Sequence, residues 1–74
     1  MVWNFRALKV KDGVGVYGVY YGQDGTIESR DSEPYVAHEE TLSDLVTRLK
    51  LLIAELESHG AIDDPFPEAG TLQL

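Results

Sequence analysis

The run His38-Glu39-Glu40 groups the side chains of this 74-residue chain that are best suited to binding a metal. Imidazole and carboxylate groups bind transition metals, but helical ligands must lie about one turn apart, as in H-E-x-x-H. Here position 42 is a leucine, and the only other histidine, His59, lies far along the chain. Because adjacent side chains do not converge on one ion, we predict that this run holds no metal.

A second acidic pair, Asp63-Asp64, stands directly before Pro65. Two neighbouring carboxylates followed by a proline are typical of a turn that faces water. We therefore interpret the pair as a solvated turn and not as a cation site.

No set of side chains has the pattern of a catalytic nucleophile with its base. The chain has no cysteine, and its two histidines are remote from each other in sequence. The four serines lie outside any nucleophile elbow, and nothing indicates a buried carboxylate pair with separated pKa values. The sequence predicts a non-enzymatic protein with no catalytic residues and no cofactor.

Three glycines, Gly13, Gly15 and Gly18, match the spacing G-x-G-x-x-G. That motif binds dinucleotides only where a strand precedes it and a helix follows at once, so that backbone N–H groups face the pyrophosphate. Here the glycines begin and interrupt a run rich in valine and tyrosine. We predict a β-hairpin at this position.

Aromatic side chains in the first part of the chain could stack on the bases of single-stranded nucleic acid. Thirteen acidic residues against six basic ones give a net charge of −7, which disfavours contact with phosphates. We therefore expect most of the rings to be core, and we expect no direct nucleic-acid binding. The rings concerned are Trp3, Phe5, Tyr17, Tyr20 and Tyr21.

The length of the chain predicts one small domain, residues 1–74. A chain of this size buries only about 60% of its unfolded surface and has no disulfide to stabilise it. Either the core is efficient or association completes the domain. No transmembrane span or signal peptide is evident, so we expect a cytoplasmic protein that does not bind membranes.

The stretch from Thr41 to Gly60 predicts an amphipathic helix over residues 42–59. Thr41 is a suitable N-cap and Gly60 a suitable residue to end the helix. Branched apolar residues recur at the spacing of one helical face. They are Leu42, Leu45, Val46, Leu49, Leu52, Ile53 and Leu56.

The opposite side of this helix carries a small, uncharged strip. Two interpretations stay open: a solvated face with one exposed leucine, or a helix-to-helix contact in a dimer or with another protein. The strip consists of Ser43, Thr47, Leu51, Ala54 and Ser58.

Strand patterns precede the helix at residues 2–11, 14–21 and 26–30, with a turn signal at Asp12-Gly13. We expect an α+β fold, a three-stranded antiparallel β-meander packed against the helix, with Trp3, Phe5 and Ala7 facing Leu49 and its neighbours. Leu49→Asp should then unfold the protein. The acidic tail, residues 61–74, is expected to dock on the domain by Ile62 and Phe66. The residues after them are expected to be partly loose. A short fourth strand at Thr71 to Leu74 is an open alternative.

Four short motifs resemble a group of uncharacterised bacterial proteins. These share a W-N-F/Y-R start, a V-Y-Y strand, an E-P turn and an E-T-L-x-x-L helix start; the group implies no function. This chain carries W-N-F-R at 3–6, Y-G-V-Y-Y at 17–21, E-P at 33–34 and E-T-L-S-D-L at 40–45. It departs from the group after Gly25, where a tryptophan is usual.

The order of hairpin, third strand and a helix beginning E-T-L is also similar to the N-terminal domain of HicB-type antitoxins. That resemblance implies an acidic protein that dimerises and blocks a small basic toxin. It assigns no functional residue to this chain.

From these observations we expect a protein-interaction module that forms a homodimer or binds another protein. The alternative is a small acidic inhibitor, of antitoxin or phage origin, that imitates the charge of nucleic acid and blocks a basic partner. Its contact residues would be Asp31, Glu33, Glu39 and Glu40.

Overall fold

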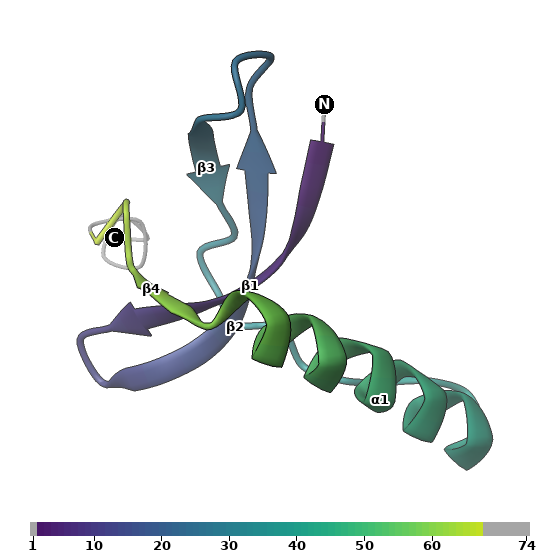
Figure 1. The fold of residues 1–74 in the computed structure, drawn as a ribbon. Helices are drawn as coiled ribbons and strands as arrows, with labels where there is room; N and C mark the ends of the chain where they lie inside the picture. Colours follow the sequence, from purple (N-terminus) through teal and green to yellow (C-terminus); the bar gives the residue numbers. More distant parts are fainter. Residues whose placement is uncertain (1, 68–74) are drawn as a thin grey trace.

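A computed structural model of the chain describes residues 2–67 and shows one α-helix beside a four-stranded mixed sheet (Figure 1). The strands lie in the order β3-β2-β1-β4. The first three are antiparallel, as predicted, whereas β4 is parallel to β1. The elements are β1 (Val2–Val10), β2 (Gly13–Tyr21), β3 (Ile27–Arg30), α1 (Leu42–His59) and β4 (Ala61–Asp63).

The fourth strand lies directly after the helix. It pairs Ile62 with Leu8, in the middle of β1. The strand considered at residues 71–74 falls outside the described part of the chain. The α+β class is therefore confirmed, but the sheet is a mixed one with four strands and not a three-stranded meander.

The hairpin between β1 and β2 has a two-residue loop. Val10 pairs with Gly13, so the loop residues are Lys11 and Asp12, one position earlier than the predicted Asp12-Gly13. Gly13 has a φ of 146°, a conformation that glycine adopts without steric cost.

The core lies on one face of the β1–β2 hairpin. Leu8 and Val19 are fully buried and Tyr17 is nearly so. Partly buried residues pack around these three, namely Val10, Tyr21, Ile27 and Ile62. The prediction of a core on the face of Trp3, Phe5 and Ala7 is wrong, because β4 brings Ile62 beside Leu8 on the other face.

Aromatic rings occupy the opposite face. Trp3 meets Phe5 edge to face with 5.1 Å between ring centroids, and the Phe5 ring lies 4.5 Å from that of Tyr35. Trp3 also approaches Tyr20, at 6.3 Å, yet stays half exposed. The rings considered for base stacking are thus divided, since Tyr17 packs in the core on the other face.

The helix α1 begins and ends where the sequence predicts. The Thr41 hydroxyl accepts a hydrogen bond from the Asp44 N–H at 3.1 Å, which satisfies one of the free donors of the first turn. Gly60 donates its N–H to the Leu56 carbonyl at 2.8 Å and has φ 68° and ψ −171°. That backbone conformation is nearly restricted to glycine, and it lets β4 start at the next residue.

Replacing this glycine tests the junction between α1 and β4. Gly60→Ala should lower the free energy of unfolding by about 1–3 kcal/mol, because alanine is strained at this φ and ψ. A Cβ at Gly60 would contact nothing within 4 Å, so the backbone conformation alone causes the loss. Urea unfolding measures it, with Ser58→Ala as an exposed control that should change little; equal stability of the two variants would contradict the assignment.

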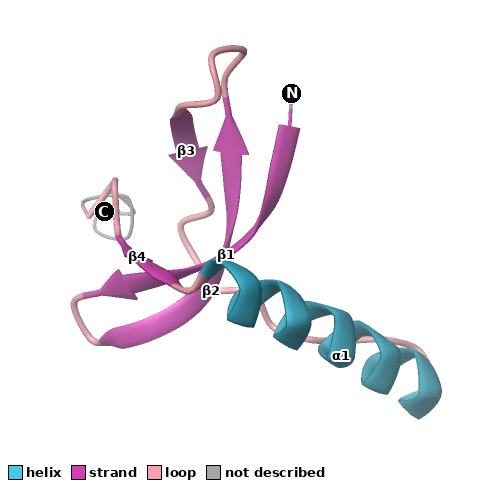
Figure 2. Ribbon diagram, viewed as in Figure 1, coloured by secondary structure: helices cyan, strands magenta, loops and turns pink. Residues whose placement is uncertain are grey.

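The helix extends away from the sheet, as Figure 2 shows. None of its 18 residues is buried. Only four are partly covered, namely Leu45, Leu52, Glu55 and Leu56. The prediction that Leu49 and Ile53 pack on the sheet is therefore wrong, since both are exposed.

Candidate interaction surface

Four apolar side chains form a continuous exposed row along α1, which we name the α1 stripe. They lie at intervals of four, three and four residues, which places them on one side of the helix. A row of this length is unusual on a monomeric protein, where exposed apolar residues are scattered singly. The exposed fractions are 75% for Leu42, 40% for Val46, 37% for Leu49 and 54% for Ile53.

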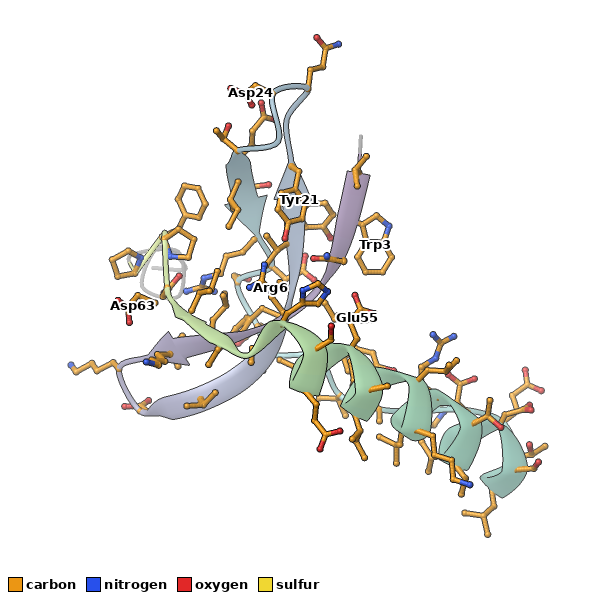
Figure 3. The ribbon with its side chains drawn as sticks, viewed as in Figure 1. Trp3, Arg6, Tyr21, Asp24, Glu55 and Asp63 are labelled. Atoms are coloured by element: carbon orange, nitrogen blue, oxygen red, sulfur yellow. The ribbon has the colours of Figure 1, made fainter. Side chains whose placement is uncertain are left out.

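The stripe borders the side of α1 that its own chain partly covers. Leu45, Leu52 and Leu56 are partly covered. Figure 3 shows Glu55 on the side of the helix that faces β1. The stripe is therefore the part of the predicted apolar face that the sheet does not reach.

The uncharged strip predicted on the back of the helix is exposed along its whole length. Leu51 is 62% exposed, and the other four members are exposed as well. Leu51 and Thr47 line a shallow hollow together with Glu39 and Arg48. The strip of Ser43, Thr47, Leu51, Ala54 and Ser58 stays a predicted contact surface, second to the more apolar α1 stripe.

The four acidic residues predicted to contact a basic partner lie on the connection between β3 and α1. Glu33 and Glu40 are exposed. Asp31 accepts a hydrogen bond from the Tyr20 hydroxyl at 2.8 Å, which raises the pKa of Tyr20. Glu39 pairs with Arg48 at 3.5 Å. Two of the four carboxylates thus already have partners within the chain.

The sequence did not reveal a buried ion pair between Arg30 and Asp64, which we name the clamp. Two parallel hydrogen bonds of 2.8 Å join the guanidinium to the carboxylate, and the side chains are only 3% and 6% exposed. The Arg30 guanidinium also lies 4.7 Å from the centre of the Tyr17 ring. Asp64 is therefore not part of a solvated turn, although its neighbour Asp63 is exposed.

Further hydrogen bonds hold the clamp in place. Arg30 donates to the carbonyls of Asp31 at 2.7 Å and Phe66 at 3.2 Å, and the Phe66 N–H donates to Asp64 at 2.9 Å. The hydrogen bond from Arg30 lowers the pKa of the Asp64 carboxyl, and the same contact raises the pKa of Arg30. The clamp thereby ties the end of β3 to the segment after β4 across the core.

Within residues 2–67, no three metal-binding side chains come together, and His38, Glu39 and Glu40 form no such group. No helix in this part of the chain is long and apolar enough to cross a membrane.

Comparisons with protein families, with curated proteins and with solved structures give no match to this chain. The two sequence resemblances described above therefore stay predictions. Any functional assignment must rest on the surfaces of the chain itself.

Proposed function

We propose that this chain is a non-enzymatic protein-interaction module that forms a homodimer through the α1 stripe. The observation that carries the proposal is an 18-residue helix in which no residue is buried. Helices in proteins owe most of their stability to packing of the apolar face. A second copy that covers the stripe would supply the missing packing.

The exposed surface area of the chain is consistent with a second copy bound to it. The chain exposes 5559 Å², whereas a compact monomer of 8.2 kDa is expected to expose about 4,500 Å². The excess, on the order of 1,000 Å², is close to the ~800 Å² that each partner contributes to a standard interface. The four side chains of the stripe supply only part of this excess, so a second copy would cover the stripe together with the residues that flank it.

The residue types along the stripe favour pairing with an identical helix. Its spacing is that of alternate d and a positions of a heptad, with Leu42 and Leu49 at d and the β-branched Val46 and Ile53 at a. β-branched residues at a with leucine at d favour parallel two-stranded pairing. We therefore propose that the two α1 helices lie parallel, each stripe against its counterpart.

The low net charge of the helix permits two copies to associate although the whole chain is strongly acidic. Between Leu42 and His59 the helix carries three acidic and two basic side chains, so it is nearly neutral. An acidic inhibitor, the alternative, would act through the carboxylates before α1 and would bind a basic protein less tightly as salt rises. An apolar dimer contact should persist at high salt.

Single cysteines test the dimer and its orientation, because the chain has no native cysteine. In a parallel pair each residue of the stripe meets its own copy, so Leu42→Cys and Ile53→Cys should both form disulfide-linked dimers under mild oxidation. Leu51→Cys, on the back of the helix, is the matched control and should stay largely unlinked. Light scattering of the unmodified protein should give the mass of a dimer.

The outcomes separate the two parts of the proposal. A dimer in which Leu42→Cys links to Ile53→Cys in a mixture of the two variants, and neither links to its own copy, would support the homodimer and contradict the parallel orientation. A monomer at concentrations up to about 1 mM would contradict the homodimer itself, since interfaces of standard size bind far more tightly than that.

A further inference from the structure

A shallow depression of about 500 Å³ lies where the start of β1, the end of β2 and the last turn of α1 meet. We name it the Arg6 depression. Polar side chains from all three elements line it, and none of the lining residues within the described part of the chain is acidic. The polar ones are Asn4, Arg6, Tyr21, Gln23 and His59.

The Arg6 guanidinium is poorly satisfied within the described part of the chain. Its Nε atom is buried and has no hydrogen-bond acceptor. One Nη atom donates to the Tyr21 hydroxyl over a long 3.4 Å, and that hydroxyl donates in turn to the Asn4 side-chain oxygen at 3.0 Å. Figure 3 shows Arg6 and Tyr21 side by side over the hairpin.

Arg6 also differs from the other two arginines in its charge partners. Arg30 pairs with Asp64 and Arg48 pairs with Glu39. Among residues 2–67, no carboxylate oxygen lies within 4 Å of Arg6, although the chain has thirteen acidic residues. Leaving a partly buried cation without a counter-ion costs free energy that a bound anion would recover.

We propose that the Arg6 depression binds a small molecule through an oxyanion group, a carboxylate or a phosphate. The Nε and Nη groups of one guanidinium can donate two parallel hydrogen bonds to such a group. The Arg6 Nε has no acceptor within residues 2–67 but is buried, so the side chain must rotate toward the depression for both groups to bind. The amide groups of Asn4 and Gln23 and the imidazole of His59 supply further donors at the rim. The site does not depend on the proposed dimer, because the α1 stripe contributes no residue to it.

The side-chain Nε–H signal of Arg6 in a nitrogen-15 NMR spectrum reports on the site directly. Sodium phosphate and, separately, sodium acetate would be titrated into the full chain at constant ionic strength, with sodium chloride as the balancing salt. We expect the Arg6 signal to shift and to saturate, while the exposed, paired Arg48 shifts little. The anion that saturates at the lower concentration identifies phosphate or carboxylate as the preferred group.

A conservative variant adds a second measurement. Arg6→Lys keeps the charge but loses the paired donors, so the anion concentration that half-saturates backbone shifts near Gly22 should rise about tenfold or more. Arg48→Lys is the matched control and should leave the half-saturating anion concentration unchanged. A linear, unsaturated shift of Arg6, or equal shifts of Arg6 and Arg48, would overturn the proposal, and so would unaltered binding by Arg6→Lys.

Discussion

Leu49→Asp should convert the protein into a monomer that keeps its sheet. Leu49 lies in the middle of the α1 stripe and is 37% exposed, so the charge faces water in the single chain. In the proposed dimer two carboxylates would be buried in an apolar contact, which should raise the dissociation constant about a thousandfold. Sedimentation equilibrium measures that change.

The core should survive this substitution, because no residue of α1 belongs to the cluster around Leu8, Tyr17 and Val19. Hydrogen exchange should show fast exchange at the start of the helix and slow exchange in β1 and β2. This expectation replaces the one from the sequence, in which Leu49→Asp unfolds the whole protein.

The matched control for Leu49→Asp is Leu51→Asp, on the back of the same helix. Leu51 is 62% exposed and belongs to the uncharged strip. The Leu51→Asp variant should remain a dimer if the α1 stripe is the interface. If Leu51→Asp dissociates the dimer and Leu49→Asp does not, the uncharged strip is the contact surface and the proposed interface is wrong.

Breaking the clamp should have the largest effect on stability. Asp64→Asn keeps the shape of the side chain but leaves the Arg30 charge buried without its counter-ion, and removal of one partner of a buried pair costs about 3–5 kcal/mol. A chain of this length has roughly 4–11 kcal/mol of total stability. The variant should therefore be largely unfolded at elevated temperature, as circular dichroism would show.

Two further variants separate charge burial from the mere loss of an ion pair. Arg48→Met breaks the exposed contact with Glu39 and should cost less than about 1 kcal/mol. Replacing both clamp residues, by Arg30→Met with Asp64→Leu, removes the unpaired charge and should restore most of the stability. A double variant as unstable as Asp64→Asn would show that the clamp stabilises by its hydrogen-bond geometry and not by charge compensation.

The clamp also predicts how stability depends on pH. Because the folded protein lowers the pKa of Asp64, its contribution is complete above the unfolded pKa of about 3.9 and is lost as the pH falls through the lower, folded value. Acid unfolding of the natural chain should therefore include a steep component below about pH 4. Asp64→Asn should remove that component. If the free energy of unfolding of the variant falls below about pH 4 as steeply as that of the natural chain, Asp64 does not have this role.

Sequence alone determined the local elements of this protein. The helix runs from Leu42 to His59 as predicted, since its N-cap at Thr41, its apolar spacing and Gly60 all act within a few residues. The hairpin and the short third strand follow in the same way from turn residues and β-branched runs. The sequence did not determine the buried face of the hairpin, since the predicted face of Trp3, Phe5 and Ala7 is not the core.

Only the tertiary structure decided which face is buried. Leu8 meets Ile62, and Arg30 meets Asp64, over separations that no periodic pattern encodes. The core lies on the Leu8 face, Arg6 forms no ion pair among residues 2–67, and no residue of α1 is buried. The sequence predicted that the whole apolar face of the helix packs on the sheet, but its own chain covers only one side of that face.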